Sequence, residues 1–360
     1  MLIGICGSIC AGKSTVAQYL VERHGFRRLS IRPDDAATAA AASTASTAPS
    51  DPSTATTFAS AEAMLDFVTL RWRDRYVTTD IASEAVLDVF SRRPFFLLIS
   101  VDAPVAVRWR RAQRRAAQPK MAPEAGANGN VGDAISLEAF VNESDFQLYG
   151  GGPQQHPPLL PVMARAAMRL ANGGLEEKSL STQPLFAALD KAGLDVQGVE
   201  QLLRPSWDRY FMSLASLAAQ RSNCMKRRVG CVLVREKRVV STGYNGTPRG
   251  LRNCGEGGCG RCNGGVGAGV GLATCLCLHA EENALLEAGR ERIPTSSLAN
   301  TILYCDTCPC LTCSIKIVQV GIGEVVYSQG YSMDAETAAV FREAGVRLRQ
   351  YIPELQTQKL

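Results

Sequence analysis

Two stretches decide how this chain is interpreted: Cys277-Leu278-His279-Ala280-Glu281-Glu282-Asn283-Ala284, and Pro309-Cys310-Leu311-Thr312-Cys313. The first stretch continues as a run rich in Ala, Leu and Glu that ends at Gly289, which predicts a helix over 280–287 that His279 opens. A second helix is predicted from Pro309, because proline suits the first helical position. Imidazole and thiol side chains therefore lie at two predicted helix starts.

The spacing of these residues is typical of a metal site. Cys310 and Cys313 are three residues apart, which places them on one helical face. The positive end of a helix dipole stabilises thiolates. With His279 the two cysteines supply three ligands, and three protein ligands leave a fourth tetrahedral position for water, as in catalytic zinc sites. We therefore predict that His279, Cys310 and Cys313 bind a catalytic Zn²⁺.

Glu281 lies two residues beyond the histidine, so it does not share the direction of that ligand. Zinc lowers the pKa of a bound water to about 7. A carboxylate beside that water can accept a proton and pass it to a substrate, and can later protonate a departing amine. The alternative is a structural zinc knuckle. Cys305 and Cys308 form a competing C-x-x-C, but the preceding Pro309 favours the pair Cys310 and Cys313.

Composition sets broad limits. The chain has 360 residues, 46% of them hydrophobic, and a formal net charge of +5, so we expect two domains and no nucleic-acid partner. The segment Met1–Gly7 has no basic region typical of a signal peptide, and no apolar run approaches the ~20 residues of a membrane span. We expect a cytoplasmic, or also nuclear, protein without a membrane partner, whose 13 cysteines are metal ligands or reduced thiols.

A phosphate-binding motif follows the apolar strand predicted over residues 2–6. Gly7-Ser8-Ile9-Cys10-Ala11-Gly12-Lys13-Ser14 reads G-x-x-x-x-G-K-S and runs into helix-compatible sequence. A buried strand is predicted over 95–101 and ends at Asp102, which we interpret as a Walker B carboxylate for Mg²⁺. The predicted nucleotide-binding residues are Gly7, Gly12, Lys13, Ser14, Thr15 and Asp102. The alternative is a scaffold loop that no longer turns over a nucleotide.

The first part of the chain resembles small P-loop kinases, notably the dephospho-CoA kinase type, in this motif and in Val101-Asp102-Ala103-Pro104 followed by spaced arginines. The resemblance implies a P-loop kinase-like α/β domain over 1–203. Disordered insertions are predicted at 34–61 and 117–134, where Ala, Ser, Thr, Pro and Gly predominate. Helical patterning is predicted over 160–170 and 185–203.

The second part alternates helices with short apolar strands. A helix is predicted from Ser206, a hairpin over 229–243, and strands near 301–304, 324–327 and 346–349 between helices that start at 279, 309 and 334. This order predicts an α/β/α sandwich around a mixed sheet of about five strands, over 204–352. Residues 353–360 are expected to form a C-terminal tail.

Further cysteines suggest a second, structural Zn²⁺. Cys254, Cys259 and Cys262 lie close together in the sequence, and the fourth ligand is open among Cys224, Cys275 and Cys277. Reduced, unligated thiols are the alternative.

The pattern H-x-E … P-C-x-x-C is the known signature of zinc nucleobase deaminases. Over about 205–352 the chain resembles the deoxycytidylate (dCMP) deaminase family, in Thr242-Gly243-Tyr244-Asn245-Gly246-Thr247-Pro248, Asn253-Cys254, the two stretches quoted first, and Gly321-Ile322 with Val325-Val326-Tyr327. The resemblance implies a cytidine-deaminase-like fold. The chain departs from the commoner family pattern at Cys305-Asp306-Thr307-Cys308, which concerns the wall of the base pocket.

The family resemblance implies hydrolysis of dCMP to dUMP and ammonia by a zinc-bound hydroxide, for thymidylate synthesis. It also implies activation by dCTP, inhibition by dTTP and a homo-oligomer. Glu281 would shuttle protons, and Asn245 with Gly246 would contact the sugar or base. Three other interpretations stay open: a tRNA adenosine or riboflavin-pathway deaminase, a P-loop kinase with a regulatory zinc domain, and a zinc-stabilised interaction domain.

Overall fold

The structure is a computed structural model of the chain. It describes residues 1–32, 56–117, 135–153, 155–173, 182–265, 267, 270–289, 301–330, 334–352 and 357–359. Nearly all of the predicted insertion at 117–134, and most of that at 34–61, lies outside the described residues. The chain divides into two compact units, Met1–Arg204 with Leu355–Leu360, and Pro205–Glu354.

The first unit contains a seven-stranded sheet in which all paired strands are parallel. Its strand order is β12 (Thr357–Lys359), β6 (Met168–Ala171), β5 (Phe96–Asp102), β1 (Leu2–Gly7), β4 (Tyr76–Thr78), β2 (Arg27–Ile31) and β3 (Thr56–Phe58). The helices are α1 (Lys13–His24), α2 (Ala61–Thr69), α3 (Glu84–Ser91), α4 (Val105–Ala117), α5 (Leu137–Tyr149), α6 (Leu160–Ala164), α7 (Gln183–Lys191) and α8 (Val196–Leu203).

Strand β1 shows why this sheet is covered on both faces. Ile3 and Ile5 belong to one buried cluster, which includes residues of α1, α7 and α8. Leu2 and Cys6 belong to a second cluster, which includes residues of α2, α3 and α6. Alternate side chains of a strand point to opposite faces, so both faces of β1 are apolar and both carry helices, as is usual for a parallel sheet.

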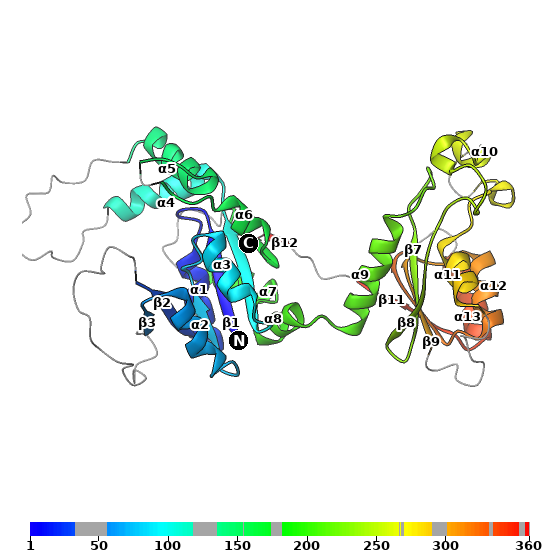
Figure 1. Cartoon of the computed structure of the whole chain (residues 1–360), viewed down its shortest axis with the longest axis horizontal. Helices are drawn as coiled ribbons and strands as arrows, with labels where there is room; N and C mark the ends of the chain where they lie inside the picture. Colours follow the sequence, from blue (N-terminus) through cyan, green and yellow to red (C-terminus); the bar gives the residue numbers. More distant parts are fainter. Residues whose placement is uncertain are drawn as a thin grey trace, which may run out of the picture. The chain divides into compact units, whose positions relative to one another are not determined.

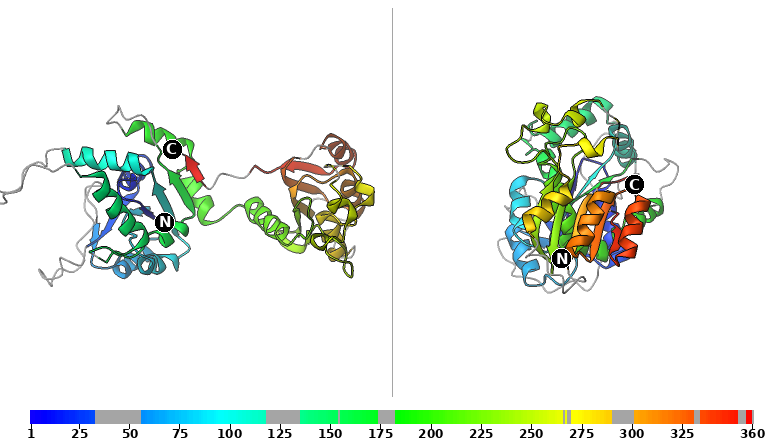
Figure 2. Two further views of the ribbon diagram at one scale, coloured as in Figure 1. Left: turned by 90° about the horizontal axis from the view of Figure 1, so that it is seen from above. Right: turned by 90° about the vertical axis from the view of Figure 1, so that its right-hand side faces the viewer.

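Three parts of the first unit differ from the sequence expectations. The helix predicted over 160–170 is wrong, because α6 ends at Ala164 and 168–171 form β6, in which Met168 and Leu170 are buried and Arg169 is exposed. That alternation has the period of a strand. Strand β3 lies within the predicted insertion at 34–61. The expected tail supplies β12, which pairs with β6 and is drawn as a red arrow beside the C-terminus (Figure 2).

The second unit contains a five-stranded mixed sheet. Its order is β11 (Arg347–Gln350), β10 (Glu324–Gln329), β9 (Thr301–Thr307), β7 (Gly230–Arg235) and β8 (Arg238–Tyr244). Strand β7 is antiparallel to β8 and β9, and the other pairs are parallel. The helices are α9 (Trp207–Ala219), α10 (Gly260–Asn263), α11 (Ala280–Ala288), α12 (Leu311–Val320) and α13 (Asp334–Glu343), with short 3₁₀ turns η2 (Cys254–Glu256) and η3 (Leu272–Thr274).

Helices cover both faces of this sheet, which confirms the predicted α/β/α sandwich. Phe211 of α9 packs in a cluster with Val232 of β7, whereas Leu233 of the same strand packs in another cluster with Ala280 of α11. Figure 1 shows α9 on one side of the strands and α11, α12 and α13 on the other. A Cβ atom at Gly243 would lie 2.0 Å from the carbonyl oxygen of Ala280, so this glycine lets α11 approach β8 closely.

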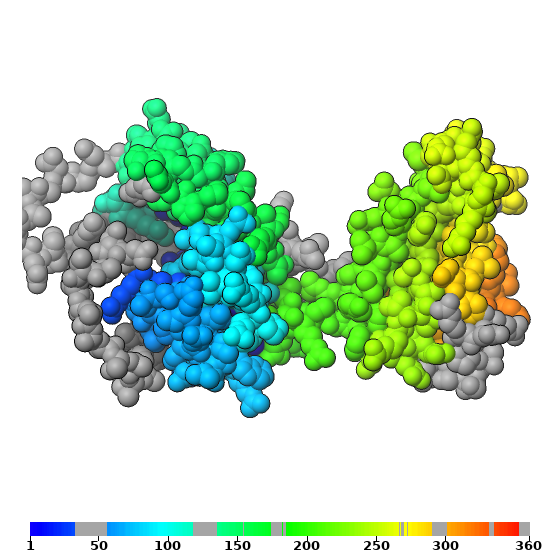
Figure 3. Space-filling view, in the orientation of Figure 1, coloured from blue at the N-terminus to red at the C-terminus, as the bar shows by residue number. Residues whose placement is uncertain are grey.

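Residues 245–275 link β8 to the segment before α11 and carry η2, α10 and η3. They are coloured yellow-green to yellow in the space-filling view (Figure 3). Among the described residues, every helix is too short or too polar to cross a membrane.

Candidate active site

Two helix starts bring the predicted metal ligands together. His279 is the N-cap of α11 and Cys310 is the N-cap of α12, so Cys313 lies in the first turn of α12. The expectation that Pro309 occupies the first helical position is wrong, because α12 begins at Leu311 and Pro309 precedes the cap. Proline still suits its position, where no backbone donor is required.

The three side chains converge on one point. The Nδ1 atom of His279 lies 3.4 Å from Cys310 Sγ and 3.3 Å from Cys313 Sγ, and the three possible ligand atoms lie within 4.8 Å of one another. Cys305 and Cys308 are buried and are not part of this group. One imidazole and two thiols at these separations fit zinc and leave a tetrahedral position without a protein ligand.

The three candidate ligands differ in how readily they lose a proton. A hydrogen bond from the Cys313 thiol, together with His279, lowers the pKa of Cys310 to about 4 despite burial. The same contact raises the pKa of Cys313, and the hydrogen bond with Cys310 raises the pKa of His279. Without a metal the pair therefore shares one thiolate. Thiolate is the ligand form of cysteine and neutral imidazole that of histidine, so Cys310 is ready to bind a cation, and a bound metal would displace the protons of Cys313 and His279.

Glu281 is buried in the first turn of α11, with a side chain that is not among the grouped ligands. Burial raises the pKa of its carboxyl group, and His279 opposes the shift. A carboxyl group whose pKa is moved toward neutrality can both accept and donate a proton. Its neighbour Glu282 has another role: it accepts a hydrogen bond from the His279 backbone N–H at 2.9 Å and pairs with Lys316.

Two hydroxyl groups that the sequence did not single out hold the start of α12. Ser314 Oγ donates to the Cys310 carbonyl at 2.9 Å, and Thr337 Oγ1 of α13 donates to the Pro309 carbonyl at 3.0 Å. Both hydroxyl-bearing residues are buried. They fix the peptide that carries the first thiol ligand. Their only sequence signal is a small polar residue in each helix.

The predicted substrate contacts lie beside the histidine. Asn245 Oδ1 accepts hydrogen bonds from Ser222 Oγ at 2.7 Å and Val229 N at 2.8 Å, and its Nδ2 donates to the Arg227 carbonyl at 2.7 Å. The amide has two N–H groups, and among the described residues the Arg227 carbonyl accepts only one of them, so the other is left for a ligand. Gly246 exchanges both backbone hydrogen bonds with Leu278, at 3.1 and 2.9 Å. Asn245 is therefore held firmly, next to the β-bridge between Gly246 and Leu278 that precedes His279.

Six other cysteines lie in one cluster that joins the turn after α9, the η2–α10 region and the segment before α11. Two groups of four have sulfur atoms within 4.8 Å of one another: Cys224, Cys254, Cys262 and Cys277; and Cys259, Cys262, Cys275 and Cys277. The expected set placed Cys254, Cys259 and Cys262 in one site, but the structure puts Cys254 and Cys259 in different groups.

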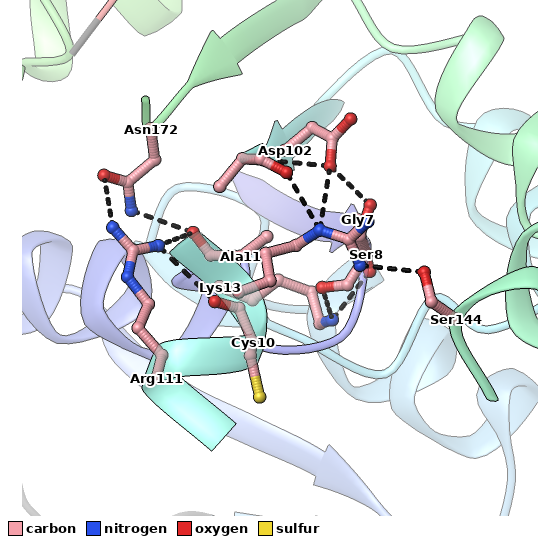
Figure 4. A network of polar contacts seen from close by, with 11 residues as sticks. Gly7, Ser8, Cys10, Ala11, Lys13, Asp102, Arg111, Ser144 and Asn172 are labelled. Carbon is pink, nitrogen blue, oxygen red and sulfur yellow. Dashed lines mark hydrogen bonds and ion pairs between the residues drawn. The ribbon is translucent and has the colours of Figure 1, made fainter. Parts of the chain in front are cut away.

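The phosphate-loop motif of the first unit joins β1 to α1. Gly12 is the N-cap of α1 and has a φ of 110°, a conformation that favours glycine. Lys13 Nζ donates to the carbonyls of Gly7 at 2.6 Å and Ser8 at 3.0 Å. Arg111 and Asn172 hold the Ala11 carbonyl at 3.2 and 2.8 Å (Figure 4). Burial lowers the pKa of Lys13.

The other predicted nucleotide-binding residues lie around this loop. Asp102, at the end of β5, accepts a hydrogen bond from Ser8 Oγ and another from Ala103 N at 2.8 Å. Ser14 is exposed in the first turn of α1, and the Thr15 N–H donates to the Gly12 carbonyl at 3.1 Å. The fold therefore brings Lys13 and Asp102 together around Ser8, a residue that the sequence analysis did not assign to the site.

A cavity of about 640 Å³ opens beside the loop. It lies where β1, β2 and β4 end, at the edge where ligands bind in open parallel sheets. Its polar lining includes Lys13, Arg32, Thr79, Asp80, Gln147 and His156. The sequence did not indicate Thr79 and Asp80 after β4, or Gln147 and His156 within and after α5, because they come from separate segments.

Similarity to known proteins identifies the family to which the chain belongs. The profile described as the cytidine and deoxycytidylate deaminase zinc-binding region matches residues 205–329. A deoxycytidylate deaminase of Schizosaccharomyces pombe is 44% identical over 351 residues, which covers 98% of this chain and 97% of the relative. The chain belongs to the deoxycytidylate deaminase family.

Two further proteins are similar to this chain. The deoxycytidylate deaminase of Saccharomyces cerevisiae is 40% identical over 98% of this chain and 96% of its own length. A dCMP deaminase from the cyanophage S-TIM5, solved with dCMP and dUMP, is 29% identical over 41% of this chain and 98% of its own, with a TM-score of 0.33. As a member of the deoxycytidylate deaminase family, the chain is an enzyme, and the two yeast relatives match both of its units.

Proposed function

We propose that this enzyme hydrolyses dCMP to dUMP and ammonia at the centre formed by His279, Cys310 and Cys313. The observation that carries the proposal is the convergence of one imidazole and two thiols, within 4.8 Å, beside the buried carboxyl group of Glu281. A purely structural zinc site does not require such a carboxyl group. The full-length relatives named deoxycytidylate deaminase support dCMP as the substrate.

His279, Cys310 and Cys313 would hold zinc, which when bound lowers the pKa of water to about 7. Glu281 accepts a proton from the attacking water and delivers it to N3 of cytosine while oxygen adds to C4. It then takes the proton of the new C4 hydroxyl group and delivers it to the amine, which leaves as ammonia while the C4 carbonyl forms, so that one water enters and one ammonia departs. The pKa of Glu281, raised by burial, suits a group that carries protons in both directions.

Asn245 is proposed to contact the nucleotide through its second side-chain N–H group, for which the described part of the chain supplies no acceptor. Ser222 Oγ and Val229 N donate hydrogen bonds to the amide oxygen of Asn245. They fix the orientation of the side chain, and with it the direction of the remaining N–H group. Gly246 is proposed to line the substrate site beside Leu278, with the Asn223 side chain in the place that a Cβ atom would take. Both contacts place substrate recognition next to His279.

Regulation of the enzyme by nucleotides and its assembly into an oligomer are also proposals. By family resemblance, dCTP would activate the enzyme, dTTP would inhibit it, and subunits would assemble into a homo-oligomer that supplies dUMP for thymidylate synthesis. The phosphate loop offers a second candidate function, binding of a nucleotide phosphate with Mg²⁺ near Asp102. Lys13, the N-terminus of α1 and the adjoining cavity favour this.

The test is ammonia release by the full-length enzyme from dCMP, CMP and deoxycytidine in parallel, with and without dCTP. We expect dCMP to be the best substrate and dCTP to increase its turnover. Absence of ammonia from all three would overturn the deaminase proposal. An equal rate with deoxycytidine would overturn the requirement for the 5′-phosphate. Phosphoryl transfer without ammonia release would favour a kinase instead.

A further inference from the structure

The cluster of six cysteines contains more thiols than one metal ion can use. Cys254, Cys259, Cys262 and Cys277 are buried, and Cys224 and Cys275 are partly buried against them. None of the six forms a disulfide. A single tetrathiolate zinc site takes four ligands, which would leave two thiols unused within the same cluster.

The sulfur separations match a zinc site and not a disulfide. Sulfurs bound about 2.3 Å from a zinc ion lie about 3.8 Å apart at the corners of a tetrahedron. The separations are 3.8 Å for Cys224–Cys262, 3.9 Å for Cys262–Cys277, 3.8 Å for Cys259–Cys275 and 3.7 Å for Cys262–Cys275. A disulfide requires about 2.05 Å.

Two of the sulfurs belong to both groups of four. Cys262 and Cys277 are shared, and each group adds two cysteines of its own. Two tetrahedra with a common edge require six ligands, which is the number present. We propose that the six cysteines hold two zinc ions in one binuclear cluster, with Cys262 and Cys277 as bridging ligands and Cys224, Cys254, Cys259 and Cys275 as terminal ligands.

The donor set selects zinc over an iron–sulfur cluster. Tetrahedral thiolate sites suit either metal. Common iron–sulfur clusters use four protein thiolates. Here the overlapping tetrahedra receive all six sulfurs from the chain, and the shared edge leaves no separate position for inorganic sulfide between the metals. Zinc is therefore the metal that the geometry favours.

Polar groups around the terminal sulfurs fit their charge. Two zinc ions and six thiolates leave a net negative charge. The Met225 N–H lies 3.5 Å and Asn263 Nδ2 3.8 Å from Cys254 Sγ, and the Arg261 guanidinium lies 3.6 Å from Cys275 Sγ. Donors of this kind orient metal-bound thiolates and partly neutralise them.

The cluster is joined to the candidate active site at two points. Cys277 precedes His279 by two residues, and Leu278 between them pairs with Gly246. On the other side, the Cys224 N–H donates to Ser222 Oγ at 3.2 Å, and that hydroxyl group donates to Asn245. The cluster would therefore fix the zinc-binding histidine and the substrate-binding amide together, a consequence that rests on the proposed deaminase function.

The first test is the zinc content of the full-length protein, measured by mass spectrometry against protein concentration. We expect three zinc ions per chain, one at His279 and two in the cluster. Two ions per chain would mean a single tetrathiolate site, and one would mean that the six thiols bind no zinc; either result would overturn the proposal. Iron with sulfide would overturn it too.

Variants separate bridging from terminal ligands. Cys262→Ser removes a ligand of both ions, so it should lower the zinc content by more than one ion per chain. Cys275→Ser removes a ligand of one ion and should lower the content by no more than one. Cys305→Ser, a buried cysteine outside the cluster, is the matched control and should keep all three. Equal losses from the Cys262 and Cys275 variants would contradict the shared edge.

A measurement on the unaltered chain covers the case in which a variant fails to fold. Cadmium-113 replaces zinc, and its magnetic resonance spectrum should show two tetrathiolate signals that are coupled to each other through the shared sulfurs. Two uncoupled signals, or one, would overturn the proposal. Neither readout uses turnover, so a failed cluster is distinguishable from a failed deaminase, which the ammonia assay reports.

Discussion

Both units of the molecule build a polar site at the start of a helix, but the two sites suit opposite charges. In the first unit, Gly12 caps α1 and leaves its backbone N–H groups for an anion. In the second unit, His279 and Cys310 cap α11 and α12. There the helix end stabilises a thiolate, and the thiolate attracts a cation. All three helices present the same positive dipole end, so the residue at the N-cap decides whether the site attracts an anion or a cation.

The largest expected effect concerns Glu281, the proposed proton carrier of the second site. Glu281→Gln keeps the shape of the side chain and removes proton transfer. We expect dCMP turnover to fall by about 10²–10⁴-fold with the zinc content unchanged. Ammonia release and zinc analysis measure the two quantities. Glu287→Gln on the exposed part of the same helix is the control, and near-normal turnover by the Glu281 variant would refute the assigned role.

The close approach of α11 to β8 tests how far the second site depends on packing. A methyl group at Gly243 would lie 2.0 Å from the Ala280 carbonyl oxygen and 2.5 Å from Ala284 N. Gly243→Ala should therefore destabilise the unit by about 1–3 kcal/mol and lower turnover, because α11 carries His279 and Glu281. Denaturant unfolding measures the stability. Gly260→Ala, where a Cβ atom meets no atom within 4 Å, is the control; equal stability of the two variants would contradict the packing argument.

Lys13 tests whether the first site binds an anion at all. Lys13→Ala removes the cation of the loop and should weaken nucleotide binding to the full-length chain by about tenfold or more, a loss of about 1.4 kcal/mol. Calorimetric titration with ATP and dCTP in the presence of Mg²⁺ measures it. Lys191→Ala, an exposed lysine at the end of α7, is the control. Identical titrations for the Lys13 variant and the unaltered chain would remove the phosphate-binding proposal.

The smallest expected effect is on stability, and it concerns an ion-pair network of the second unit that is not part of the candidate active site. Arg349 hydrogen-bonds to Asp208 at 2.7 and 3.0 Å, which with Tyr304 lowers the pKa of Asp208. Its stabilisation is present above the unfolded pKa of about 3.9 and is lost as the pH falls through the lower folded value.

Asp208→Asn should therefore cost up to about 1 kcal/mol at pH 7, and the cost should shrink as the pH falls below about 4. Unfolding followed by tryptophan fluorescence at several pH values measures it. Glu343→Gln, an exposed carboxyl group at the end of α13, is the control. A cost that does not change with pH would show that the ion pair is not its source.

The sequence predicted those features that are determined by short, continuous stretches of residues. His279, Glu281 and the Cys310–Cys313 pair stand in short stretches whose spacing alone indicates helix starts, and the alternation of helices and apolar strands indicated the sandwich. The phosphate loop is one continuous stretch of the same kind.

The missed features depend on contacts between distant segments. Strand β12 returns to β6 from the far end of the chain, and the alternation of Met168 and Leu170 is too short to outweigh the helical pattern before it. The sharing of Cys262 and Cys277 between two groups, and the support of Cys310 by Thr337, arise only when separate loops and helices meet.

Removal and return of zinc test the central claim most directly. The full-length enzyme is treated with a chelator until the zinc content falls, and ammonia release from dCMP is measured before treatment, after it, and after zinc is added back. The account predicts that turnover disappears with the zinc and recovers with it. Undiminished turnover in the metal-free protein, or no ammonia from dCMP in the zinc-loaded protein, would contradict the assignment of His279, Cys310 and Cys313 as a catalytic centre.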